Sequence, residues 1–301
     1  MKLRLFYNSA VIATILSYLL IFIGGLVRVS GAGMGCPSWP KCGEGWIPPT
    51  NVDINQINTT LAWIEFTNRM FGVVLGVSII ILNIIAIFYF RKNHTLLFYS
   101  ILSLIFVVIN GLLGGALVWF ELNPYIKTAH MLFALVLVSI LSYICIKSYK
   151  MLNPNIFQGL KNNLILSKSL IFLWILIVIE ILLGTGLRTG IELIAIDNPL
   201  FSKSDQLDAL PYYKYLHSIL GFSLLFFSIY INYNLRNHPL LLARQLAYFI
   251  TGMIVLQIFL GEMMIFFDLP QLTRLFHTWG SSWLVGVIII LYNCISNEYA
   301  K

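Results

Sequence analysis

Eight long apolar runs constrain this chain more than any other feature of its sequence. A membrane-spanning helix needs about 20 consecutive apolar residues, because the hydrocarbon layer leaves no water to bind free backbone groups. Hydrophobic residues make up 59% of the chain and charged residues only 10%, which excludes a soluble globular protein. We therefore predict an all-α integral membrane protein with helices over residues 9–29, 63–90, 97–119, 126–146, 167–187, 211–232, 243–267 and 274–296.

The basic residues predict how these helices are oriented. Lysine and arginine concentrate in the connections on the side of the N-terminus, whereas most acidic residues fall on the opposite side. By the positive-inside rule, both termini lie in the cytoplasm, and the chain contacts membrane lipid on its apolar faces. The net charge of +7 is explained by this topology and gives no reason to expect a nucleic-acid partner.

The two halves of the sequence resemble each other. GGLVR at residues 24–28 is similar to GTGLR at residues 184–188, an offset of 160 residues. FTNRMFG aligns with YLHSILG at an offset of 149 residues, which sets Asn68 against His217. Such repeats are common in membrane proteins. We predict two pseudo-symmetric four-helix bundles, residues 1–150 and 151–301, joined by a basic segment on the inner side.

Three of the five histidines, His130, His217 and His277, each begin an apolar run on the outer side. Such a histidine either bonds a neighbouring helix or binds a metal. His217 and His277 are at the same depth of the second half, an arrangement that supplies two axial imidazoles to a haem iron. The first half offers His130 and Asn68. Because an amide is a poor iron ligand, we predict that the first half binds a porphyrin more weakly than the second half. Such a pocket suits a ligand that enters and leaves.

One carboxylate and three arginines lie near these positions. Glu65 is three residues before Asn68, so the two share a helix face. A carboxylate at the edge of hydrocarbon is a functional candidate, and the alternative is a salt bridge with Arg69. Two interpretations are open for Arg28, Arg69 and Arg188: they snorkel to the interface, or they pair with haem propionates.

The outer loop at residues 30–62 contains two cysteines, Cys36 and Cys42, with Pro37 and Pro40 between them. On the oxidising side of the membrane this pair predicts a disulfide bond. Zinc binding would need two further ligands, which the loop lacks. Whether the bond braces the loop or exchanges electrons is left open by the sequence.

At these residues the chain resembles the heme A synthase family of bacterial and mitochondrial membranes. The resemblance rests on GAGMGCPSWPKC in the outer loop, on EFTNR at residues 65–69, and on the histidines that begin three apolar runs. It implies an enzyme that oxidises the C8 methyl group of haem O to the formyl group of haem A by successive hydroxylation, with water as the oxygen source. The product is a cofactor of cytochrome oxidase.

The resemblance also assigns roles. It implies that His217 and His277 hold a haem b that passes electrons, and that the first half, with His130 and Asn68, takes the substrate haem. It ties Glu65 to catalysis. It further implies the bacterial cytoplasmic (inner) membrane, with haem sites toward the outer face. A haem O synthase and an electron acceptor are candidate partners, and the sequence leaves open whether the chain forms a homo-oligomer.

The chain departs from the family pattern in two places. Asn68 stands where the family usually has histidine, and the loop at residues 189–211 lacks a second cysteine pair found in some members. Two other functions therefore compete with the enzyme. One is a haem-binding membrane electron carrier of the cytochrome b kind, and the other is a non-catalytic haem carrier or assembly factor. Retention of Glu65 argues against the second.

Overall fold

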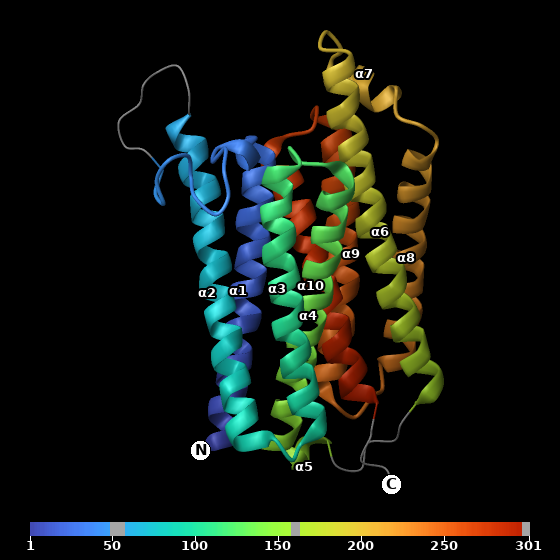
Figure 1. Ribbon diagram of the computed structural model, residues 1–301. Helices are drawn as coiled ribbons and strands as arrows, with labels where there is room; N and C mark the ends of the chain where they lie inside the picture. Colours follow the sequence, from blue (N-terminus) through green and yellow to red (C-terminus); the bar gives the residue numbers. More distant parts are fainter. Residues whose placement is uncertain (49–57, 158–162, 297–301) are drawn as a thin grey trace. The chain divides into compact units, whose positions relative to one another are not determined.

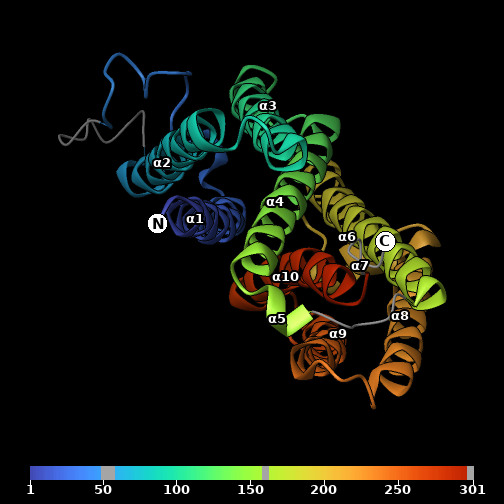
Figure 2. The same cartoon turned by 90° about the horizontal axis from the view of Figure 1, so that it is seen from below.

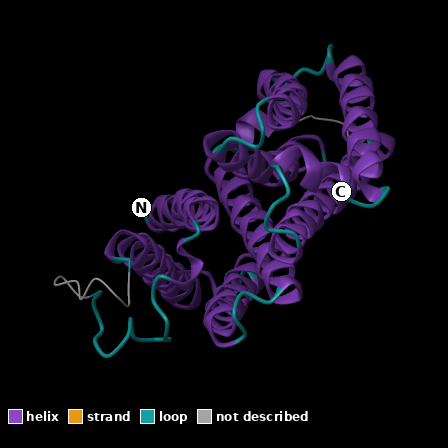
Figure 3. Cartoon of the chain, turned by 90° about the horizontal axis from the view of Figure 1, so that it is seen from above, coloured by secondary structure: helices purple, strands orange, loops and turns teal. Residues whose placement is uncertain are grey.

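The computed structural model describes residues 1–48, 58–157 and 163–296 (Figure 1). Within these ranges eight helices are long and apolar enough to cross a membrane, as predicted, and no β-strand is present (Figure 3). The eight helices are α1 (Lys2–Ser30), α2 (Thr59–Phe90), α3 (His94–Trp119), α4 (Pro124–Leu152), α6 (Leu164–Asp197), α8 (Tyr213–Leu235), α9 (Leu241–Phe266) and α10 (Gln271–Ile295). The shorter elements are η1 (Ala32–Met34), α5 (Pro154–Phe157) and α7 (Lys203–Asp208).

The chain forms two compact units, Met1–Leu152 and Asn153–Lys301. In the first unit α1 packs against α2 and α4, and α3 packs against α2 and α4, so that the four helices form a closed ring (Figure 2). In the second unit α6, α8, α9 and α10 pack in the same cyclic order. Short loops make consecutive antiparallel helices neighbours from α2 to α4 and from α8 to α10, whereas the connections from α1 to α2 and from α6 to α8 are longer.

Asparagine caps begin three of the long helices. The side chains of Asn58, Asn93 and Asn163 accept hydrogen bonds from the backbone three residues later, at 3.2, 3.1 and 3.1 Å. α1 ends differently, at Gly31, whose φ of 74° is left-handed and whose N–H bonds the carbonyl of Val27. These signals fix the helix ends without large loops.

The apolar core of each unit lies away from the loops that precede α2 and α8. In the first unit the buried cluster includes Phe6 and Ala10 of α1, Ile79 of α2 and Leu141 of α4. In the second unit the fully buried side chains follow the same distribution along their helices: Leu170, Leu173, Ile177, Ile231 and Leu291. The opposite end of each unit contains most of the glycines and polar side chains considered below, and this end is here called the loop end.

One predicted boundary is wrong. The sequence predicts a loop from residue 189 onward, but α6 continues to Asp197, and a further 6 residues of this segment form α7. The extension is supported by an i,i+4 ion pair, in which Nε of Arg188 lies 3.3 Å from Oε1 of Glu192. α7 begins with a capping box between Ser202 and Asp205, and these hydrogen bonds lower the pKa of the Asp205 carboxyl.

Two turns at the loop ends share an unusual backbone. Glu121 and Leu122, between α3 and α4, have φ of 48° and 61°, and Asp268 and Leu269, between α9 and α10, have φ of 61° and 59°. Two adjacent left-handed residues without glycine are costly, at about 1 kcal/mol or more each. In each turn a hydrogen bond compensates, from Leu122 to Leu117 at 2.7 Å and from Leu269 to Met264 at 2.8 Å. The two turns are separated by 147 residues, the offset between His130 and His277.

Candidate haem-binding and redox site

The outer loop is closed by the predicted disulfide bond between Cys36 and Cys42, which confirms that pairing. Both cysteines are buried, and the backbone N–H of Cys42 bonds the carbonyl of Gly45 at 2.9 Å. The loop lies directly on the start of α2, because a Cβ added at Gly35 would be 2.5 Å from the carbonyl oxygen of Leu61. Only glycine permits this approach of two backbones.

An ion pair on α2 holds this loop. Oε2 of Glu65 accepts a hydrogen bond of 2.8 Å from the backbone N–H of Cys36, and Oε1 pairs with the guanidinium of Arg69. The same guanidinium donates to the carbonyls of Ser38 at 2.8 Å, Lys41 at 2.9 Å and Cys36 at 3.2 Å. Glu65 is only 4% exposed. The salt bridge considered as an alternative for Glu65 is therefore present, and the guanidinium of Arg69 is taken up by the loop.

The loop also covers part of α3. The indole of Trp39 lies against Gly115, where an added Cβ would be 2.9 Å from Cδ2, and it meets Trp119 edge to face at 5.3 Å between ring centroids. On the other side of the loop, Gly33 faces Leu122, with Cδ1 at 3.1 Å from an added Cβ. The disulfide loop thus rests on α2, on α3 and on the turn that precedes α4.

In the second unit, His217 of α8 and His277 of α10 face each other, with ring centroids 6.4 Å apart. Each ring lies against a glycine of the preceding long helix. A Cβ added at Gly184 of α6 would be 3.1 Å from Cε1 of His217, and a Cβ added at Gly261 of α9 would be 3.8 Å from Cε1 of His277. Glycine is needed most clearly at position 184.

The first unit places its corresponding residues in the same way. A Cβ added at Gly24 of α1 would be 3.6 Å from Oδ1 of Asn68, and one added at Gly114 of α3 would be 3.7 Å from Cε1 of His130. Oδ1 of Asn68 is buried and has no hydrogen-bond partner among the described residues. Nδ1 of His130 lies near the backbone of Asn110 without a well-aligned hydrogen bond. Both side chains therefore present buried polar atoms in need of a partner.

The histidine pair of the second unit fits the iron of a haem. Two imidazoles that bind one metal ion from opposite sides, with metal–nitrogen bonds of about 2 Å, have ring centroids about 6 Å apart. The observed separation of 6.4 Å agrees with this value. The imidazoles come from two helices of one bundle, which is how helical bundles build cofactor sites.

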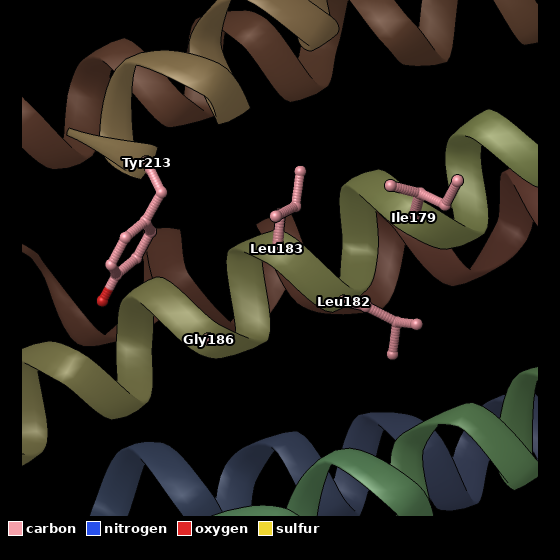
Figure 4. Close-up of a pocket in the computed structure, with 5 residues that line it drawn as sticks. All are labelled: Ile179, Leu182, Leu183, Gly186 and Tyr213. Atoms are coloured by element: carbon pink, nitrogen blue, oxygen red, sulfur yellow. The ribbon is translucent and has the colours of Figure 1, made fainter. Parts of the chain in front are cut away.

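An apolar groove lies between α6 and the start of α8, and neither histidine lines it (Figure 4). Ile179, Leu182, Leu183 and Gly186 of α6 line the groove together with Tyr213 at the start of α8, whose ring points toward α6. The groove is within two residues of Gly184 along α6 and is lined almost entirely by carbon. Such a surface suits a flat apolar ligand edge or a lipid chain.

The remaining predicted site residues are two arginines. Arg28 is in the last turn of α1, whereas Arg188 lies nine residues before the end of α6 at Asp197. The contact between Glu65 and the backbone of Cys36 was not predicted from the sequence. Nor was it predicted that Gly24, Gly114, Gly184 and Gly261 each lie against a candidate ligand. The equal spacing of 16 residues from Gly114 to His130 and from Gly261 to His277 was the available signal.

These features define a multi-pass helical membrane protein whose second unit pairs two imidazoles in its bundle. A sequence model of the COX15-CtaA family, described as cytochrome oxidase assembly protein, matches residues 7–289. The chain belongs to this family. The match covers nearly all of both units and confirms the family predicted from the sequence motifs.

Several curated relatives are named heme A synthase. The protein of Geobacillus thermodenitrificans is 32% identical over 130 residues, which cover 43% of this chain and 38% of the relative. The protein of Geobacillus kaustophilus is 30% identical over 131 residues, covering 44% and 39%. A Listeria monocytogenes relative is 29% identical over 133 residues, covering 44% and 41%. The aligned region thus spans about two-fifths of each relative's length.

Proposed function

We propose that this protein is a heme A synthase, which oxidises the C8 methyl group of haem O to the formyl group of haem A. The observation that carries the proposal is the facing pair His217 and His277, 6.4 Å apart between ring centroids, in a chain of this family. The relatives' shared name supports the same activity. The conversion adds oxygen from water and releases electrons and protons, so it requires an electron acceptor.

In the proposed enzyme the second unit holds a haem b. His217 and His277 would hold it through their imidazoles, and Gly184 leaves room for the ring of His217. When bound, this group supplies one-electron redox chemistry. Arg188, at the loop end of α6, is placed to pair with a propionate, although it also pairs with Glu192.

The first unit takes the substrate haem. His130 is its iron ligand in the proposal, and Asn68 occupies the place of the second ligand without supplying an imidazole. Glu65 lies one turn from Asn68 and acts as a base or as a negative charge that stabilises a cationic reacting carbon. Arg28 is the proposed propionate partner in this unit. Arg69 donates hydrogen bonds to the backbone of the disulfide loop and at the same time pairs with Glu65.

Pigment analysis tests the proposed activity. The protein is expressed in bacterial membranes together with a haem O synthase, and the extracted haems are separated by chromatography. We expect haem A and its hydroxylated precursor. If both are absent while the low-spin spectrum of a bis-imidazole haem persists, the protein is a haem-binding electron carrier or haem carrier and the enzyme proposal is wrong.

Asn68→His is expected to tighten haem binding in the first unit. The side chain at this position lies against Gly24 as His217 lies against Gly184, so an imidazole can occupy the same place. A second nitrogen ligand strengthens iron binding severalfold relative to an amide. The measurement is the haem-to-protein ratio after purification with excess haem. A ratio equal to that of the unmodified protein would show that residue 68 does not face the iron.

Gly184→Ala is expected to lower the haem content of the second unit severalfold. The added Cβ would lie 3.1 Å from Cε1 of His217, so the ring must move from its position opposite His277. Gly186→Ala, two residues further along α6, is the matched control because nothing lies within 4 Å of its added Cβ. Equal loss of the low-spin spectrum in both variants would mean that the effect comes from α6 as a whole.

A further inference from the structure

Glu180 is a partly buried acid in the middle of α6 for which the sequence alone suggests no role. A carboxylate inside a membrane-spanning helix is expensive unless a partner stabilises it. Its Oε1 lies 3.0 Å from Nδ1 of His217 on α8, and the two side chains are 15% and 22% exposed. The distance is within hydrogen-bond range, but the two groups are not aligned for a hydrogen bond in this geometry.

Two glycines make room for this pair. On α6, Glu180 is one turn before Gly184, and on α8, His217 is one turn before Gly221. Gly184 accommodates the imidazole, with Cε1 at 3.1 Å from an added Cβ. Gly221 accommodates the carboxylate, with Oε1 at 3.3 Å from an added Cβ. The two helices thus present matching pairs, each with one polar side chain facing a glycine.

The first unit provides an internal comparison. At the offset of 160 residues the position of Glu180 is occupied by Leu20, and at the offset of 149 residues the position of His217 is occupied by Asn68. The repeat with histidine at the aligned position has the carboxylate, and the repeat with asparagine at that position has a leucine. A carboxylate retained only for helix packing would have no reason to accompany the histidine.

The other histidines lack such a partner. Nδ1 of His130 and Nδ1 of His277 lie near the backbones of Asn110 and Gln257, and neither has a side-chain hydrogen-bond partner among the described residues. Only a backbone carbonyl is thus near these two rings, and it is a weaker acceptor than a carboxylate. His217 is therefore distinguished from the other two by an anionic partner.

We propose that Glu180 is a positioning residue that accepts a hydrogen bond from Nδ1–H of His217 and lowers the midpoint potential of the haem held by His217 and His277. This inference rests on the proposed function of the second unit. A carboxylate on the outer nitrogen fixes the tautomer and ring orientation and makes the metal-binding nitrogen more basic. Its negative charge also favours the ferric over the ferrous state. Both effects make the haem a better donor to the next electron carrier.

The test is a spectroelectrochemical titration of the purified, haem-loaded protein. Glu180→Gln keeps the shape and an acceptor oxygen but removes the charge, and Glu180→Leu removes both. We expect the low-spin bis-imidazole spectrum in both variants and a midpoint shifted to more positive potential, further for leucine than for glutamine. The ferric EPR signal verifies that both axial ligands remain.

Glu262→Gln is the matched control. Glu262 lies on α9 beside Gly261 and forms no hydrogen bond or ion pair with either ring in the described part of the chain. The midpoint potential of the haem in Glu262→Gln should therefore equal that of the unmodified protein. An unchanged midpoint in Glu180→Gln with an intact low-spin signal overturns the role of Glu180 alone. Equal shifts of the midpoint potential in the Glu180 and Glu262 variants would mean that any lost negative charge has this effect. That result also overturns the proposed role of Glu180. Absence of the low-spin signal from the unmodified protein overturns the haem b site itself.

Discussion

His277→Ala is expected to abolish the low-spin haem spectrum of the purified protein, and His217→Ala is expected to do the same. The two rings face each other across 6.4 Å, which leaves space for one metal ion between them. Alanine removes one of the two nitrogen ligands, so any haem that remains has one axial protein ligand and a high-spin spectrum. This is a loss of the spectroscopic signature and not a small shift.

His94→Ala provides the matched control for these variants. His94 is the first residue of α3, at the end of the first unit opposite the disulfide loop. Its replacement should leave the low-spin spectrum unchanged. Size-exclusion chromatography of each variant in detergent separates loss of ligation from loss of folding. Survival of the low-spin spectrum in His277→Ala would show that the rings do not bind the iron.

Glu65→Gln is expected to lower the formation of haem A and its hydroxylated precursor by about 100-fold or more, the usual loss on removal of a general acid or base. Glutamine has nearly the same size and keeps an oxygen for the backbone N–H of Cys36, now 2.8 Å from Oε2. It cannot supply the negative charge. The low-spin spectrum should persist, because its two ligands belong to the second unit.

Glu65 has a second role that this experiment must separate from the first. The Glu65–Arg69 pair holds the disulfide loop, so a variant could lose activity because the loop leaves its place. Arg69→Leu removes the ion-pair partner of Glu65, and the double variant Cys36→Ser, Cys42→Ser removes the disulfide bond; both disturb the loop while Glu65 itself is kept. If these variants lose as much haem A as Glu65→Gln, the effect of Glu65 is exerted through the loop. If Glu65→Gln forms haem A at the unmodified rate, the carboxylate has no part in catalysis.

The spanning helices could be predicted from the sequence because the hydrocarbon layer demands one simple property, about 20 apolar residues in a row. The residue at which α6 ends could not be predicted in this way. Past Arg188 the helix is stabilised by the local ion pair with Glu192 and by its own apolar residues rather than by the membrane. The disulfide bond was predictable from two cysteines in one outer loop.

The candidate site was predictable only in part. The repeat pattern was sufficient to align Asn68 with His217 and to pair His217 with His277. The contacts of Glu65 and Glu180 depend on which backbone or ring lies opposite them, at 2.8 and 3.0 Å, and no spacing within one helix contains that information. The sequence presented the salt bridge with Arg69 and catalysis as alternatives for Glu65. In the structure Glu65 forms the salt bridge and is still a candidate for catalysis.

The two left-handed turns control the rotation of the helices that follow them. Leu122 and Leu269 are each eight residues before a histidine, His130 or His277, and each is tied by its backbone hydrogen bond to the end of the preceding helix. A helix turns by about 100° per residue, so one residue inserted in either turn would carry the imidazole to a different face of its helix. These short turns therefore set the angular register of the histidines. An alteration of loop length there would turn a candidate ligand away from its present position without changing any candidate residue.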